Sequence, residues 1–366
     1  MRNWRGTAAM RSAEAGVPRT MPAEPPFHLL INPRHGVPGI VVLPEGAFRR
    51  ARAEIAGWPG RAPVAARSLD DWAKRLGIAA LHVEEGGRDG DAASYGVLRL
   101  LVTELARRGV AAAAKAAELE SGRFAEATRG ITVVGAGDEA LPVALAAARF
   151  GARCVVVLRP GYEGALRDAI AVSGAMIRTH ASDEGDGLRH AAEVAAAEGW
   201  FIVSARSWTG QTELPRDMMQ AQRLAAAETL DALPHPPSHV FVRAGAGGTK
   251  AAAFSVALRA RHGIDSRLVV VEPAHASGLL VCAKHGGEPI GQPDDFAAAT
   301  PDLLAWQELG RASFAFAALD EAAARGRGLP GGADLTLSAL SVVAADSDAR
   351  TRLGLRAGSR VLLAAD

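Results

Sequence analysis

The stretch HVFVRAGAGGT at residues 239–249 decides the fold, because it joins an apolar strand pattern to a glycine-rich turn and the start of a helix. Parallel α/β sheets are built from such strand–turn–helix units. Three glycines and a threonine leave several backbone N–H groups and one hydroxyl to hold a phosphate. The spacing is not that of a P-loop. A tight turn that needs positive φ at glycine explains the same residues equally well.

The same rhythm extends outward from this stretch over most of the chain. Short β-branched runs alternate with alanine-rich stretches whose apolar residues recur at spacings of three and four, which predicts βαβ units with right-handed crossovers. The predicted strands are 79–84, 131–134, 153–158, 176–180, 201–204, 239–243, 267–272 and 360–364. The predicted helices are 94–109, 139–150, 162–174, 186–198, 215–230, 249–262 and 334–345. The sequence therefore predicts the α/β class.

Length and composition narrow the possibilities further. The chain has 366 residues, with 49% hydrophobic residues and 41 basic against 40 acidic side chains. Its size favours two lobes or one large α/β domain, and its balanced charge excludes a nucleic-acid-binding tract. Cys154 and Cys282 lie far apart without a Cys/His cluster, so we expect no metal site. We find no membrane-span or signal pattern and expect the cytoplasm.

The first 26 residues differ in character from the rest. Residues 1–26 carry scattered charge, show no periodicity and end in Pro25-Pro26. This pattern is typical of a disordered leader, so we expect the fold to begin near residue 27.

A second glycine-rich turn follows the strand predicted at 131–134. Its sequence, GAGDEA at 135–140, has the G-x-G-x-x-A form of a dinucleotide fingerprint. The next strand ends in Leu158-Arg159, which would favour the 2′-phosphate of NADP. Asp138 and Glu139 argue against this interpretation, because they place two carboxylates where a pyrophosphate would lie. An NADP-binding oxidoreductase stays an alternative.

Several segments together resemble the diaminopropionate ammonia-lyase family, and the resemblance runs from about residue 27 to the end. They are LINPR (30–34), ARAEIAGWPGRAP (51–63), SWTGQTELP (207–215), VFVRAGAGG (240–248), VEP (271–273), and GL (354–355) followed by SRVLL (359–363). The resemblance implies a fold type II pyridoxal-phosphate (PLP) enzyme, similar to tryptophan synthase β. It implies a homodimer that eliminates ammonia from 2,3-diaminopropionate, with pyruvate formed after hydrolysis.

The resemblance also implies a division of the chain and a cofactor site. Residues 27–96 and 206–366 would form a large lobe and residues 97–205 a small lobe, each with a mostly parallel sheet flanked by helices. The turn of Gly245, Ala246, Gly247, Gly248 and Thr249 would cradle the cofactor phosphate, and Asp138 would lie in the loop under the cofactor ring.

The site departs from the family pattern in four places. The family's Schiff-base lysine lies in a Ser-Phe-Lys-x-Leu-Gly segment, and that position holds Gly96 in SYGVLR at 94–99. The two family acids align with Ala136 and Ala205, and the family's ring-contacting asparagine aligns with Asp138. The family's Thr-Glu-Gly segment after the final strand is replaced by Ala364-Ala365-Asp366.

The lysine inventory limits any repair of this site. The chain contains four lysines, at 74, 115, 250 and 284, and a PLP enzyme needs a lysine to tether the cofactor and move protons. Lys250 follows the glycine turn directly and suits a phosphate contact better than an aldehyde contact. Lys74, Lys115 and Lys284 read as surface side chains.

The sequence therefore predicts a catalytically impaired homologue, a pseudoenzyme. It would bind PLP non-covalently or another phosphate-bearing ligand, or pair with an active paralogue. The first alternative is an active ammonia-lyase on 2,3-diaminopropionate or a related β-substituted amino acid, with Lys250 as the amine. The second alternative is the NADP-binding oxidoreductase.

Overall fold

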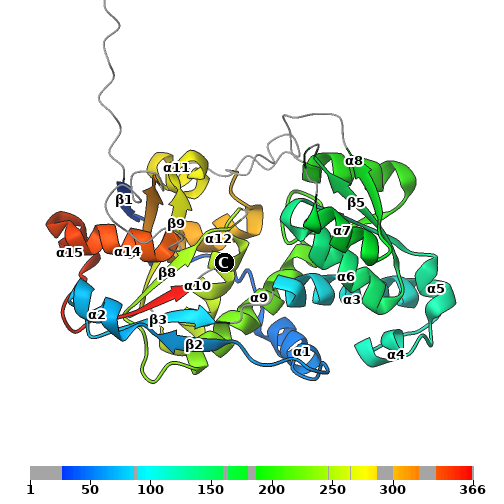
Figure 1. Cartoon of the computed structure of the whole chain (residues 1–366), viewed down its shortest axis with the longest axis horizontal. Helices are drawn as coiled ribbons and strands as arrows, with labels where there is room; N and C mark the ends of the chain where they lie inside the picture. The colour runs from blue at the N-terminus through cyan, green and yellow to red at the C-terminus, as the bar shows by residue number, and fades with distance from the viewer. Residues whose placement is uncertain are drawn as a thin grey trace, which may run out of the picture.

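The structure is a computed structural model with two β-sheets flanked by helices, which lie on opposite sides of helix α9 (Glu213–Asp231) in Figure 1. It describes residues 27–85, 89–159, 161, 164–179, 187–245, 247–263, 265–286, 300–320 and 335–364. The predicted leader at 1–26, Ala246 of the glycine turn and the last two residues lie outside these ranges.

The larger sheet has seven strands, five of them parallel in its centre. Their order is β1 (Phe27–Ile31), β10 (Ala315–Leu319), β9 (Arg267–Pro273), β8 (His239–Arg243), β11 (Arg360–Ala364), β3 (Ala80–Glu85) and β2 (Ala65–Ser68). The edge strands β1 and β2 pair antiparallel with β10 and β3. The mostly parallel α/β architecture predicted from the sequence is confirmed.

Both faces of the larger sheet are buried, which explains why its central strands are continuous apolar runs. Along β8, Val240 and Val242 pack on one face and Phe241 on the other, as the pleat requires. The first face is covered by α9, α10 (Thr249–His262), α11 (Gly278–His285) and α12 (Leu303–Ala312). The second is covered by α2 (Asp70–Leu76), α14 (Leu335–Ala345) and α15 (Ser347–Leu353).

The smaller sheet has four parallel strands. Their order is β6 (Met176–Thr179), β5 (Arg153–Leu158), β4 (Thr132–Ala136) and β7 (Phe201–Ile202). Its surrounding helices are α3 (Asp89–Arg107), α4 (Ala116–Glu120), α5 (Ala125–Arg129), α6 (Ala140–Phe150), α7 (Ala165–Val172) and α8 (Gly187–Glu198). Helix α3 runs without a break across the predicted lobe boundary at 96–97, and the boundary itself stays a prediction.

The eight predicted strands are all present, and the described residues add β1, β2 and β10. These three carry weak strand signals: β10 is AFAAL, and β2 is AARS. The short helices α4, α5, α11, α12 and α15, and α1 (Glu45–Ile55), were likewise not predicted, whereas the residues of α2 were expected to be helical. No helix among the described residues is both long and apolar enough to cross a membrane.

Arg61 fastens the loop between α1 and β2 to two long helices. Its Nη1 and Nη2 donate to the two carboxylate oxygens of Glu228 on α9, each at 2.8 Å, and its Nε donates to Asp91 on α3 at 2.8 Å. The Arg61 side chain is 5% exposed. Bidentate guanidinium–carboxylate pairs of this kind are strong when they are buried. This contact holds α3 and α9 in register, and both helices carry residues of the candidate site.

We expect Arg61→Gln to lower the free energy of unfolding by about 3 kcal/mol, because it leaves two partly buried carboxylates without their partner. Urea denaturation measures the change. The control is Lys74→Gln, whose pair with Asp71 spans 4.0 Å between side chains that are 80% and 88% exposed. That variant should change stability by less than about 0.5 kcal/mol. Equal effects in both variants would contradict the role given to Arg61.

Candidate active site

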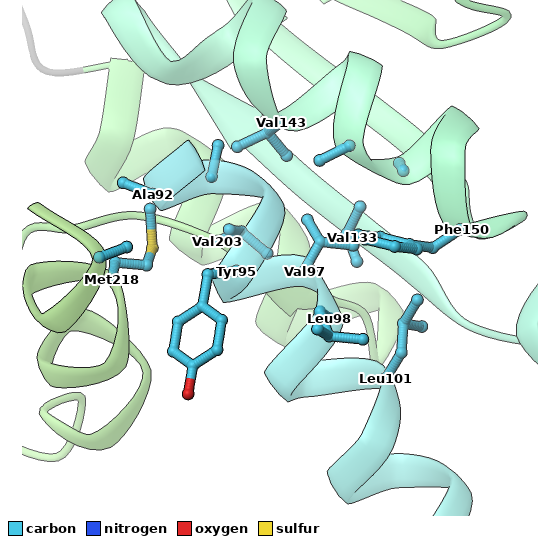
Figure 2. Close-up of a cluster of buried hydrophobic side chains, with 14 of the residues drawn as sticks. Ala92, Tyr95, Val97, Leu98, Leu101, Val133, Val143, Phe150, Val203 and Met218 are labelled. Atoms are coloured by element: carbon cyan, nitrogen blue, oxygen red, sulfur yellow. The ribbon is translucent and has the colours of Figure 1, made fainter. Parts of the chain in front are cut away.

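Gly96, which the sequence predicts at the position of the family's Schiff-base lysine, lies buried inside helix α3. A Cβ added to Gly96 would be 2.7 Å from Cγ and 2.8 Å from Sδ of Met218 on α9, and 3.5 Å from Cγ1 of Val203. Met218 is 1% exposed, and Figure 2 shows its side chain reaching across to the first turns of α3. Contacts shorter than 3.0 Å do not occur for real Cβ atoms, so no side chain fits at residue 96 unless Met218 moves. The position is hydrophobic core.

The neighbouring side chains on α3 offer no replacement amine. Tyr95 is 3% exposed, and burial raises its pKa to about 12, so the phenol stays protonated at neutral pH. Val97 and Leu98 are packed in the same cluster, as Figure 2 shows. This part of α3 therefore contributes packing rather than acid–base chemistry.

The loop at 135–140 meets the loop at 204–206 through Glu139. The Glu139 carboxylate accepts a hydrogen bond of 2.8 Å from the backbone N–H of Ala205 and another from the Ser204 hydroxyl. Burial raises the pKa of Glu139, and these hydrogen bonds act in the opposite direction. Ala136 and Ala205, which the sequence predicts at the two positions of the family acids, are both buried. In the sequence, Glu139 only argued against the binding of a dinucleotide, and its hydrogen bond with residue 205 was not predicted.

Asp138 of the same loop is exposed, next to the left-handed Gly137 at φ +58°. The short 3₁₀ turn η1 (Gly137–Glu139) leads from β4 into α6. Two carboxylates in this turn disfavour a pyrophosphate at the start of α6, because like charges repel. The NADP interpretation therefore gains no support from the local geometry.

The glycine turn between β8 and α10 has all three glycines in the left-handed region. The φ angles are +64° at Gly245, +70° at Gly247 and +92° at Gly248, where L side chains are strained. A Cβ at Gly247 would lie 3.0 Å from Cβ of Asp302, and a Cβ at Gly248 would lie 2.9 Å from Cδ1 of Leu279. A side chain at Gly247 or Gly248 would therefore be strained by the positive φ angle and would also crowd a neighbouring side chain.

Asp302 ties the glycine turn to the loop at 206–207. Its backbone N–H donates to the carbonyl of Gly247 at 2.9 Å. Its carboxylate accepts from the Ser207 hydroxyl at 2.8 and 2.9 Å, and from the N–H of Ala305 at 2.8 Å as the N-cap of α12. Asp302 is 1% exposed, and burial raises its pKa. Asp302 was not predicted as a site residue, because the amino-acid sequence at 287–299 has no helical or strand periodicity that would point to an element after it.

Three backbone groups of the turn keep their hydrogen-bonding capacity. Among the described residues, the N–H groups of Gly247, Gly248 and Thr249 donate to no acceptor. They precede the first turn of α10, where the helix dipole favours an anion. The Thr249 hydroxyl is buried and accepts from Nε2 of Gln222 at 3.5 Å. The turn is thus able to hold a phosphate through its amides, while its threonine already has a partner.

Lys250 pairs with a buried carboxylate of the large sheet. Its Nζ lies 3.2 Å from Oε2 of Glu84 on β3, and the two side chains are 21% and 2% exposed. Oε1 of Glu84 also accepts from the Thr229 hydroxyl at 3.3 Å. The sequence predicted a phosphate contact or a relocated amine for Lys250, and it did not predict the pair with Glu84. Lys74, Lys115 and Lys284 are exposed, as predicted.

The class of protein follows from a comparison of the chain with models of known families. A family model described as "Pyridoxal-phosphate dependent enzyme" matches residues 106–364. The chain belongs to this family of PLP-dependent enzymes.

Diaminopropionate ammonia-lyases are among its relatives. The Salmonella typhimurium protein is 25% identical over 182 residues, which are 46% of this chain and 45% of that protein. The Escherichia coli K12 protein is 23% identical over 197 residues, 51% of this chain and 50% of that protein. The chain thus aligns with about half the length of the curated relatives it matches. The resemblance to this family predicted from the sequence is confirmed.

Solved structures carry the same fold. The holo diaminopropionate ammonia-lyase of Escherichia coli matches with a TM-score of 0.78 at 20% identity, over 93% of each chain. Maize serine racemase matches with a TM-score of 0.64 at 16% identity, over 88% of this chain and 93% of that one. The fold type II architecture is therefore confirmed.

A covalently held PLP does not fit the residues at the family's lysine position. Gly96 supplies no amine, and Met218 fills the space that the first carbon of a lysine would need. Lys250, the lysine nearest to the glycine turn in sequence, is bound to Glu84. No catalytic step through the cofactor follows from this arrangement.

We expect Gly96→Ala to destabilise the protein by about 1–3 kcal/mol, because the added methyl overpacks against Met218. This reverses the usual helix preference, in which alanine is more favourable than glycine by about 0.5–1 kcal/mol. The matched control is Gly90→Ala in the same helix, where an added Cβ has no atom within 4 Å. The control should be neutral or slightly stabilising in urea denaturation, and the pair Gly96→Ala/Met218→Ala should lose the clash. A stabilising Gly96→Ala would contradict the packing described here.

We expect Lys250→Met to destabilise the protein by about 3 kcal/mol, because the Glu84 carboxylate then stays buried without its cation. Adding Glu84→Gln should recover most of this loss, since the amide carries no charge and still accepts from Thr229. The double-mutant cycle is read from chemical denaturation. Additive effects of the two substitutions would show that Lys250 and Glu84 are not coupled.

Proposed function

We propose that this chain is a non-catalytic homologue of the diaminopropionate ammonia-lyases, a pseudoenzyme of the PLP-dependent family. The contact between Gly96 and Met218 carries the proposal, because a lysine that tethers PLP has neither an amine nor space at this position. The alanines at 136 and 205 support it, since neither side chain is able to move a proton.

The polar groups around these positions support the same proposal in another way. The carboxylate of Asp302 is bound to Ser207 and to the start of α12, and Glu139 accepts a hydrogen bond from the backbone N–H of Ala205. Such contacts join the loops of the protein to one another and stabilise the fold. We infer that the sequence around the former site has been adapted to hold these loops together.

The experiment that tests the proposal measures cofactor attachment and turnover together. Wild-type protein mixed with PLP should not develop the absorbance of a lysine-bound cofactor, and it should release no pyruvate from 2,3-diaminopropionate. Gly96→Lys combined with Met218→Ala is the restoration variant, because it supplies both the amine and the space. A gain of cofactor absorbance in that variant alone would support the alignment of residue 96 with the family lysine.

The alternative function is an active ammonia-lyase on 2,3-diaminopropionate or a related β-substituted amino acid, with Lys250 as the amine. The similarity of this chain to diaminopropionate ammonia-lyases favours this alternative. The ion pair with Glu84 disfavours it, because an Nζ held in a salt bridge has first to leave its partner before it attacks an aldehyde. Pyruvate release by wild type that is lost in Lys250→Met, with an unchanged circular dichroism spectrum, would overturn the pseudoenzyme proposal.

A phosphate-bearing ligand held without a covalent bond is a second candidate function. The N–H groups of Gly247, Gly248 and Thr249, which donate to no acceptor among the described residues, lie at the start of α10 and favour it. The ligand would be PLP or another phosphorylated small molecule. We further propose a homodimer, or a heteromer with an active paralogue, located in the cytoplasm.

We expect calorimetric titration to detect PLP more strongly than pyridoxal, which lacks the phosphate. Gly245→Asp should weaken the PLP signal by at least about tenfold, because it adds a carboxylate at a position with open space and φ +64°. Aspartate tolerates this backbone region better than most residues. The matched control is Gly60→Asp, with open space and φ +70°, which should leave binding unchanged. Equal binding of pyridoxal and PLP would contradict a phosphate site at the turn.

A further inference from the structure

Glu272, near the carboxyl end of β9, is a buried carboxylate that the candidate site does not use. It is 4% exposed and lies opposite Ala318 of β10 in the sheet. Its two oxygens accept hydrogen bonds of 3.0 Å and 2.9 Å from the backbone N–H groups of Leu279 and Leu280. Both donors belong to the first turn of α11, so Glu272 joins the end of β9 to the start of this helix (Figure 1).

The start of α11 packs in turn on the glycine turn. Leu279 is 1% exposed, and a Cβ added to Gly248 would lie 2.9 Å from its Cδ1. Leu279 therefore both donates its N–H to Glu272 and fills the space beside Gly248. If the start of α11 moved away from β9, the glycine turn would lose this packing.

Burial sets the charge of the Glu272 carboxyl group. It raises the pKa of Glu272 from 4.5 to about 7, and the hydrogen bonds from Leu279 and Leu280 oppose this shift without cancelling it. The carboxyl group is therefore close to half ionised at neutral pH, although a glutamate in water is almost fully ionised there.

The ionisable side chains around Glu272 do not account for this shift. On α11, burial and the charge of Glu272 raise the pKa of the Cys282 thiol, so this neighbour stays uncharged at neutral pH. The described charged or titratable groups on the adjoining elements contribute nothing to the pKa of Glu272: these are Lys284 and His285 of α11, His275 of the 3₁₀ turn η2 (Ala274–Ala276), Arg243 of β8, Lys250 of α10, and Asp320 after β10.

The direction of the pH effect follows from linkage. If α11 moves and water reaches Glu272, its pKa falls from about 7 toward the ordinary 4.5. Ionisation therefore favours the loosened state, and protonation favours the packed state. The stabilisation that the neutral carboxyl group provides is complete below pH 4.5 and is lost as the pH rises through 7.

We propose that Glu272 makes the contact between α11 and the glycine turn sensitive to pH: α11 stays packed on Gly248 while Glu272 is protonated, and it loosens when Glu272 ionises. The double role of Leu279 carries this inference, because one residue connects the carboxylate to the turn. The consequence for a ligand rests on the proposed phosphate site. A phosphate held by the turn would bind more weakly above pH 7 than below it.

Amide hydrogen exchange of the full-length protein tests this contact without a ligand. Glu272→Gln is the reference, because its amide is neutral at every pH, and comparing the two proteins at each pH cancels the intrinsic pH dependence of exchange. We expect the ratio of wild-type to Glu272→Gln exchange rates in α11 to rise at least about fivefold between pH 5.5 and 8.5. Glu85→Gln, at an exposed carboxylate of β3, is the matched control and should exchange like wild type.

A rate ratio that is constant, or that falls as the pH rises, would overturn the proposal, because ionised Glu272 would then not loosen α11. If Glu272→Gln does not fold, the wild-type protein alone decides. The exchange rates of the α11 amides are then divided by those of the buried α10 amides at 251–258 in the same sample. The same rise with pH is expected in this second ratio.

Calorimetric titration with PLP at pH 6 and pH 8.5 tests the link to the turn. Over this range wild type should lose at least about threefold more affinity than Glu272→Gln, and the comparison removes the ionisation of PLP itself. Equal losses in both proteins would overturn the coupling of Glu272 to the turn. If neither protein binds PLP at any pH, the proposed phosphate site is wrong, and the exchange ratio still decides whether Glu272 controls α11.

Discussion

The packing of Met218 against Gly96 is the constraint on which the rest of the site depends. A side chain at position 96 would require Met218 on α9 to move, and α3 and α9 are themselves joined by Arg61 through Asp91 and Glu228. The absence of a side chain at Gly96 leaves the space that the buried Met218 side chain occupies. The proposed loss of the lysine therefore goes with a buried methionine in the same place.

Buried carboxylates join the loops around this core to one another. Glu139 joins the loop at 135–140 to Ala205, and Asp302 joins the glycine turn to Ser207. In each case a carboxylate binds a neighbouring backbone or hydroxyl group and stabilises the packing of one loop on another. The chain thus has a scaffold of the PLP-dependent family, and these carboxylates take part in hydrogen bonds that join its loops.

The sequence predicted the fold well where strands are buried on both faces. Apolar runs such as HVFVR at 239–243 and RLVVV at 267–271 are readily predicted as strands, because the strands of a parallel sheet are covered on both faces and carry apolar residues on both. The edge strand β2 and the alanine-rich β10 were missed, because pairing with neighbours and not residue preference makes them strands.

The site was predictable only in part. The sequence predicted that Gly96 stands at the family's lysine position. It did not predict the contact of residue 96 with Met218, because the two residues lie 122 positions apart and meet only through helix packing. The pairs of Lys250 with Glu84 and of Asp302 with Ser207 are long-range for the same reason. Single-sequence patterns report which groups are absent from a site more readily than which groups have replaced them.

The most direct measurement is the mass of the intact protein after incubation with PLP and reduction with borohydride, which fixes any lysine-bound cofactor permanently. The account predicts a mass equal to that of the unmodified chain, while Gly96→Lys/Met218→Ala gains one pyridoxyl group. A pyridoxyl group on the wild-type chain, mapped by peptide sequencing to Lys250 or to any other lysine, would contradict it.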